Sequence, residues 1–143
     1  GVMGTMKARV TAKDCVNYGD VIIPAITSAT ATPGGVSGFM DGAGSIMENC
    51  INYGKVIPYA PGSLYMGGIT ASPNKYDGQM KNCSNYGDLF YYAVPAKQSY
   101  FGGVVGYAKA EGDGSQFSMI DCHNYGLQHA RRRYHRQRRA DRR

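Results

Sequence analysis

One six-residue motif, Asx-Cys-x-Asn-Tyr-Gly, occurs four times in this chain and constrains its fold more than any other feature. The copies lie at 14–19, 49–54, 82–87 and 121–126. The cysteines of successive copies are 35, 33 and 39 residues apart, a period that is typical of solenoids, propellers and other repeat proteins. All four cysteines of the 143-residue chain lie in these copies. The chain is therefore predicted to be a repeat protein.

Each repeat unit contains three short segments that favour β-strands. The first has the form Gly-Val/Ile-x-Gly/Ala, the second leads through a turn into the cysteine motif, and the third is an apolar run after the motif, as in 20–23 and 88–92. Short β-branched and aromatic runs bounded by Gly, Pro and Asn are typical of strands. No segment has the length and period of a helix. The variable segments are expected to be corner loops: 24–33, 58–66, 72–79 and 107–116.

Three strands in each 33 to 39 residues fit one rung of a parallel β-solenoid. The predicted fold is therefore an all-β parallel β-helix of about three to four rungs, with three short strands per rung. A β-propeller is the second choice, because a blade usually needs four strands and about 40 residues or more. Neighbouring rungs would lie about 4.8 Å apart, so equivalent residues would form columns.

The predicted columns make up a structural ladder. Its members are Cys15, Cys50, Cys83 and Cys122, beside Asn17, Asn52, Asn85 and Asn124. The thiols would fill a narrow interior, and the amides would hydrogen-bond to the turn backbone and to the next rung. The glycine after each tyrosine is expected to supply a positive φ at a corner.

Charge divides the chain into two predicted regions. Residues 1–126 carry eight basic and nine acidic side chains, and residues 127–143 carry eight arginines and one aspartate. We expect 1–126 to be the β-solenoid domain and 127–143 to be a basic, disordered tail. The tail could bind nucleic acid non-specifically, whereas the nearly neutral body has no such feature. No apolar run is long enough to span a bilayer, so no membrane insertion is expected.

The motif Gly-Gly-Val-x-Gly followed by Asx-Cys-x-Asn-Tyr-Gly resembles the Gly-rich repeats of the GLUG type. These occur in large secreted or surface-anchored bacterial proteins, including adhesin-like proteins. The resemblance covers about residues 1–126 and implies an exported protein, at the cell surface or secreted. It also implies an adhesion module that contacts a glycan or a host surface protein. The repeat pattern begins and stops within a unit, so the chain is expected to be a fragment of a longer repeat protein.

Reactive residue types give no catalytic, cofactor or metal site at a recognisable spacing. Free stacked thiols are favoured over disulfides, because parallel Cβ atoms about 4.8 Å apart exceed the usual disulfide separation of about 3.5–4.5 Å. Disulfides remain an alternative, and metal sites would need closer cysteine pairs. The acidic turns at 41–44, 77–78 and 111–114 favour tight turns over calcium binding. His123, His129 and His135 have no partner acid or nucleophile at a sequence spacing that is typical of a catalytic site.

Aromatic residues in or beside the variable segments are the best functional lead. A tyrosine on a loop combines an apolar face with a hydrogen-bonding tip, which suits contact with a sugar or a protein. The candidate ligand-contacting residues are Tyr59, Tyr65, Tyr76, Tyr91, Tyr92 and Tyr100. Packing between loops is the structural alternative. The predicted function is a non-enzymatic surface interaction module, which as a solenoid could also stack end to end. The alternative is a fragment of a β-helix polysaccharide-degrading enzyme.

Overall fold

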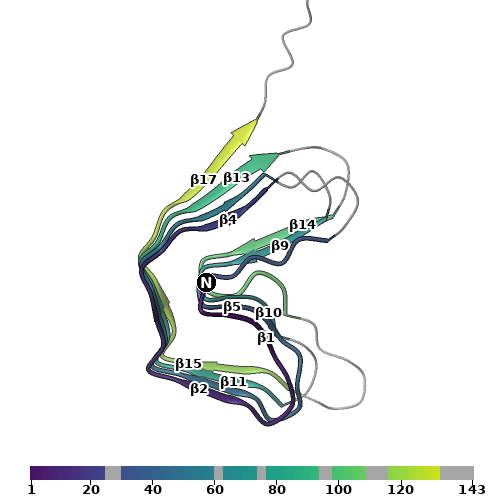
Figure 1. Ribbon diagram of the computed structural model, residues 1–143, viewed down its shortest axis with the longest axis vertical. Coiled ribbons are helices and arrows are strands. Elements are labelled where there is room, and N and C mark those ends of the chain that lie inside the picture. The colour runs from purple at the N-terminus through teal and green to yellow at the C-terminus, as the bar shows by residue number, and fades with distance from the viewer. Residues whose placement is uncertain (25–29, 60–62, 74–76, 94–97, 109–115, 133–143) are drawn as a thin grey trace, which may run out of the picture.

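The computed structural model describes residues 1–24, 30–59, 63–73, 77–93, 98–108 and 116–132 (Figure 1). Every strand pair in these ranges is parallel, and the same ranges contain no helix. Accordingly, nothing in the described part is a helix that could cross a membrane. The protein is an all-β parallel solenoid, which confirms the fold predicted from the repeats.

Strands that occupy the same place in successive rungs pair to form five stacked sheets. The sheet that leads into each motif contains β2 (Thr11–Lys13), β6 (Ile46–Glu48), β11 (Gln79–Lys81) and β15 (Ser118–Ile120). The sheet formed by the motifs themselves contains β3 (Val16–Asn17), β7 (Ile51–Asn52), β12 (Ser84–Asn85) and β16 (His123–Asn124). In this sheet Asn17 is opposite Asn52, Asn52 opposite Asn85, and Asn85 opposite Asn124.

The three remaining sheets complete the coil. The apolar runs after the motifs form β4 (Val21–Ile23), β8 (Val56–Pro58), β13 (Leu89–Ala93) and β17 (Gln128–Arg132). The return segments form β9 (Leu64–Gly67) and β14 (Ser99–Gly102). The strands after the paired glycines are β1 (Met3–Met6), β5 (Ser37–Met40) and β10 (Thr70–Pro73). The strand regions expected in each unit are thus present, except that the Gly-Val-Val-Gly segment at 103–106 forms only an isolated bridge, from Val105 to Thr70. The return segment adds a further strand.

In cross-section the coil has two lobes, each with its own core (Figure 1). The lower lobe lies between the β1–β5–β10 and β2–β6–β11–β15 sheets, and its core is rich in sulfur. The fully buried sulfur-bearing members of this core are Met6, Met40, Met47, Met80, Cys50 and Cys83. The upper lobe lies between the β4–β8–β13–β17 and β9–β14 sheets. Its core contains Val56, Leu64, Met66 and Leu89.

The first residue of each motif makes the sharp corner before the cysteine. Asp14, Asn49, Asn82 and Asp121 all have left-handed backbones, with φ between 50° and 55°. Aspartate and asparagine tolerate this conformation better than other residues with a side chain. Glycine was expected to supply the positive φ, but the motif glycines do not have it. That prediction was wrong, because the turn lies at the start of the motif.

The motif glycines are required by close stacking instead. A Cβ built on Gly54 would overlap the carbonyl oxygen of Gly19, and one on Gly87 would overlap the carbonyl oxygen of Gly54. Successive corners therefore lie backbone against backbone, and a methyl group would separate the rungs. Gly19 begins this column, and a Cβ there would have nothing within 4 Å.

The asparagine column lies at the waist between the two lobes. Each inner asparagine donates from Nδ2 to the Oδ1 of the next, at 2.7 Å from Asn52 to Asn85 and from Asn85 to Asn124. The same Nδ2 atoms donate to the carbonyl oxygens of Gly54 and Gly87 in their own rungs, each at 2.8 Å. A Cβ on Gly68 would overlap the side chain of Asn85. The paired glycines therefore let the returning chain lie directly against the amide ladder.

The described solenoid extends beyond the boundary predicted at residue 126. β17 pairs with β13 from Gln128 opposite Leu89 to Arg132 opposite Ala93. The Leu127 amide also donates to Asp88 Oδ1 at 2.9 Å, and this bond lowers the pKa of the Asp88 carboxyl. Residues 127–132 are thus part of the fold, and 133–143 lie outside the described residues. The loop expected at 58–66 is corrected as well, because β9 begins at Leu64.

The loss of stability on replacing an asparagine of the ladder is expected to depend strongly on how deeply that asparagine is buried. Asn85→Ala removes an acceptor for Asn52, a donor to Asn124 and a donor to Gly87 from a fully buried site. We expect the free energy of unfolding in urea to fall by about 2–4 kcal/mol. Asn124→Ala, at an exposed site, should cost less than about 1 kcal/mol. Equal losses at the two sites would contradict a buried ladder.

A matched pair of glycine variants tests the close stacking of the corners. Gly87→Ala places a methyl group against the Gly54 carbonyl oxygen and should lower the free energy of unfolding by about 3 kcal/mol or more. Gly19→Ala occupies the same motif position with open space around it and should change stability by less than about 1 kcal/mol. Neither residue has a positive φ, so thermal or urea unfolding of the pair isolates the steric effect.

Candidate functional site

A column of four free thiols runs along the lower core. Cys50 and Cys83 are completely buried, and Cys15 and Cys122 are partly exposed. The Sγ of Cys83 lies 3.3 Å from the carbonyl oxygen of Lys81 and 3.6 Å from that of Met47 in the preceding rung. Backbone bonds such as Ile51 N to Cys15 O, at 2.9 Å, connect neighbouring members of the column. The cysteines therefore lie in a single file, as the repeat predicts.

The members of the thiol column differ in acidity. Hydrogen bonds with the thiols of Cys122 and Cys50, together with burial, raise the pKa of Cys83 well above its usual range. A hydrogen bond from Cys83 lowers the pKa of Cys122, and burial raises the pKa of Cys15. Of the two partly exposed thiols, Cys122 is thus the stronger acid and the better nucleophile at neutral pH.

The motif tyrosines form a second column, on the outer surface. The ring centroids of Tyr18, Tyr53, Tyr86 and Tyr125 are 5.3, 5.1 and 4.8 Å apart in sequence order, with interplanar angles of 6° to 16°. Tyr53 and Tyr86 are nevertheless 45% and 46% exposed. Because both faces of these rings are covered by their neighbours, the exposure comes from the ring edges. A sugar ring, which stacks on an aromatic face, has no free platform at the middle of this column.

Tyr65 and Tyr100, two of the predicted ligand-contacting residues, do lie together. They are opposite one another in β9 and β14, and their ring centroids are 5.4 Å apart. Tyr107 joins them, at 4.9 Å from Tyr65 and 4.5 Å from Tyr100. All three are partly exposed. Tyr65 alternates with the buried residues Leu64 and Met66, so it points away from the upper core.

The other predicted aromatics do not join this cluster. Tyr91 packs on the upper core and lies 4.2 Å from the ring of Phe101. Tyr59 is 46% exposed and follows β8. Tyr92 is within β13, but its side chain is outside the described part, and Tyr76 is itself outside the described residues.

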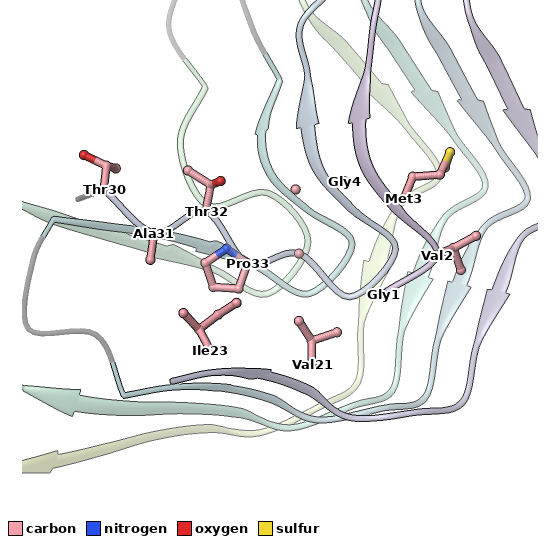
Figure 2. A pocket seen from close by; sticks show the side chains of 12 residues that line it. Gly1, Val2, Met3, Gly4, Val21, Ile23, Thr30, Ala31, Thr32 and Pro33 are labelled. Carbon is pink, nitrogen blue, oxygen red and sulfur yellow. The ribbon is translucent and has the colours of Figure 1, made fainter. Parts of the chain in front are cut away.

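A pocket of about 490 Å³ lies at the first rung, between β4 and the segment 30–34 (Figure 2). Figure 2 shows Val21 and Ile23 on one side and Ala31 and Pro33 on the other. The hydroxyls of Thr30 and Thr32 are the polar side-chain groups among its described lining residues. The other side chains among the described lining residues are apolar, and the α-amino group of Gly1, whose pKa is lowered by burial, is the one basic group there.

A smaller pocket of about 210 Å³ is lined in part by His129, which belongs to the one histidine–carboxylate pair that the structure describes. Its lining comes from β9, β13, β14 and β17 and includes His129 and Tyr91. His129 Nε2 is 3.4 Å from Asp88 Oδ2, and its ring stacks on Phe90 at 4.6 Å. No serine or cysteine is among the described lining residues. The pair therefore helps to hold β17 against β13.

The described acidic turns have protein partners. Asp41 Oδ2 lies 3.3 Å from Lys7 Nζ, and Asp77 Oδ1 accepts a bond of 3.2 Å from the Gln116 amide. Glu111 and Asp113 lie outside the described residues. Among the described residues, no three His, Cys, Asp or Glu side chains are grouped so that they could hold a metal ion.

Comparison with known proteins gives no significant match to a family model, a curated protein or a solved structure. The candidate site is therefore defined by its geometry: the partly exposed cluster of Tyr65, Tyr100 and Tyr107.

Sequence reasoning missed Tyr107, which follows the last Gly-Val-Val-Gly segment in a region expected to be a loop. Its place directly after a paired-glycine motif was the available signal. The stacking of the motif tyrosines was also missed, although the shared register implied it.

The thiol column predicts an order of alkylation. Folded protein treated with iodoacetamide at pH 7 should be labelled first at Cys122, then at Cys15, and only on unfolding at Cys50 and Cys83. Peptide mass spectrometry over a time course measures the order. In denaturant without reductant, all four cysteines should become alkylated. Fewer than four modified residues under that condition would point to a disulfide.

Proposed function

We propose that this chain is a non-catalytic interaction module of a bacterial cell-surface or secreted protein, and that it contacts a glycan or a protein ligand. The observation that carries the proposal is the convergence of Tyr65, Tyr100 and Tyr107 from consecutive turns of the solenoid into one partly exposed cluster. Grouped tyrosines combine apolar ring surface with hydroxyl groups at little cost in conformational entropy.

The scaffold beneath the cluster supports a binding role. Tyr65 and Tyr100 belong to paired strands whose neighbours, Leu64 and Met66, are buried in the upper core. A binding residue on a packed strand is held more firmly than one on an isolated loop. The resemblance of the repeats to GLUG-type repeats supports an adhesin-like setting at the bacterial surface. Among the described residues that line the pockets at the first rung and beside β17, no two carboxylates face one another, which favours binding over glycan cleavage.

The proposal is tested by measuring binding and turnover with the same protein. Labelled chain is applied to a glycan array and to a panel of extracellular proteins, and is incubated separately with acidic and neutral polysaccharides. We expect saturable binding without release of reducing ends. Cleavage of a polysaccharide would overturn the non-catalytic assignment, and the absence of binding on both panels would contradict the proposal as a whole.

A set of tyrosine variants locates the binding surface. Tyr65→Ala and Tyr100→Ala should each weaken binding about tenfold, corresponding to about 1.4 kcal/mol. Tyr65→Phe keeps the ring and its stacking on Tyr107, so it separates loss of the hydroxyl from loss of the surface. Tyr18→Ala removes a ring that is 77% exposed but outside the cluster and should bind as the parent does. Weakening by Tyr18→Ala alone would move the site to the motif tyrosines.

A further inference from the structure

In the described part of the chain, the first and last rungs each have an edge without a partner strand, and these two edges match one another. The first-rung edge consists of the outer sides of β2, β3 and β4, and the last-rung edge consists of the outer sides of β15, β16 and β17. These six strands are the terminal members of three parallel sheets, so each has a row of backbone groups facing away from its sheet. All pairing in the described solenoid is parallel and in register. The last-rung edge is therefore shaped to receive a first-rung edge.

The asparagine ladder has a direction, and its two ends are complementary. Every link runs from Nδ2 in one rung to Oδ1 in the following rung, beginning with Asn17 to Asn52 at 2.7 Å. Within the described part, Asn17 Oδ1 at the first-rung edge receives no bond. At the other edge, Asn124 uses Nδ2 to reach Gly126 O at 2.9 Å, and its second N–H has no described acceptor. One edge thus offers an acceptor, and the other offers a donor in the same column.

Apolar columns are also exposed where they reach the edges. Met119 is 49% exposed, although Met47 and Met80 in the same column are completely buried. Tyr18 and Tyr125 are 77% and 59% exposed, compared with 45% and 46% for the two inner rings. Each exposed residue has the same place in its rung as a more buried inner residue but has a neighbouring rung on one side only. A rung on its other side would bury it.

We propose that a second copy of this chain docks head to tail on the last-rung edge, so that its β2, β3 and β4 pair with β15, β16 and β17. Asn124 then donates to Asn17 of the second copy, and Tyr125 stacks on its Tyr18. The contact joins two different surfaces and leaves one of each kind free. Such an association does not close and builds chains of copies along the solenoid axis.

Two columns of side chains, one ending in Asp121 and one in Ile120, would be poorly matched across this junction, and variants in them test it. Asp14 and Asp121 occupy equivalent positions, so docking brings two carboxylates together where the inner rungs have Asn49 and Asn82. Asn49 Nδ2 donates to Asp14 Oδ1 at 2.9 Å, and the Asp14→Asn variant keeps that acceptor. The variant also provides a new donor toward Asp121 of the neighbouring copy and removes the repulsion. It should therefore tighten association about tenfold without loss of stability.

In the column that contains Ile120, two variants of opposite charge at that one position are expected to change association in opposite directions. Its members in order are Lys13, Glu48, Lys81 and Ile120, and Lys13 pairs with Glu48 at 3.5 Å. Docking places Lys13 of the second copy over Ile120. Ile120→Glu continues the alternation of charge and should tighten association about tenfold, whereas Ile120→Lys should weaken it by a similar factor. Ser84→Glu and Ser84→Lys make the same charge changes in an inner rung and should leave the association constant within about twofold.

Sedimentation velocity across a concentration series at physiological ionic strength measures the association. The parent chain should form oligomers that grow with concentration, and the variants should shift that growth as stated. A chain that stays monomeric at every concentration would overturn the proposal. A dimer that grows no further would overturn it as well, because it indicates closure through like edges. Equal effects of Ile120→Glu and Ile120→Lys, or of the Ser84 pair, would exclude the predicted register.

Discussion

The amide ladder at the waist is the interaction on which the rest of this structure depends. Its asparagines connect rung to rung, satisfy the carbonyl oxygens of their own corners and fill the space between the two lobes. Buried amides without these partners would cost free energy, so the rungs must stay in register. Register in turn places the cysteines, the tyrosines and the paired glycines in columns. The two sequence signatures, paired glycine and Asx-Cys-x-Asn-Tyr-Gly, are the two sides of this one contact.

The same register has different chemical consequences on the two sides of the motif strand. Inward, it places small polarizable sulfur side chains in a narrow core, where Cys50 and Cys83 are completely buried and shielded from reagents in solution. Outward, it stacks the motif tyrosines face to face, which leaves their edges for contact with other molecules. The aromatic cluster on the return strands is less regular, because its rings come from segments that vary between repeats. Variation on a fixed scaffold suits recognition, and this contrast is why the return face, rather than the motif face, carries the proposed binding site.

The position of a residue could be predicted from the sequence only if that residue belonged to the repeated motif. The cysteine and asparagine columns followed from identical positions in four copies. Tyr65 was expected on the loop at 58–66, and Tyr100 in or beside a variable segment, but both lie on paired strands. Tyr91 packs inward on the upper core. Whether an aromatic side chain faces the core or the solvent depends on the phase of its strand. For Tyr65 and Tyr100 that phase could not be read, because their strands were not predicted. Tyr91 lies in the predicted strand 88–92, where three successive aromatic residues show no alternation from which the phase could be read.

The period, the parallel stacking and the columns follow from the repeated motif alone, because a repeat can bury its apolar residues only by lying on its neighbours in register. The two-lobed cross-section, the left-handed corner at Asx in place of glycine, and the return strand that brings Tyr65, Tyr100 and Tyr107 together became apparent only in the folded chain. So did the extension of the coil through β17, despite the basic composition there. These features depend on contacts between segments within one rung, which do not repeat as a pattern along the chain. The repeat therefore predicts how the rungs stack, whereas packing between the segments of one rung determines the shape of its cross-section.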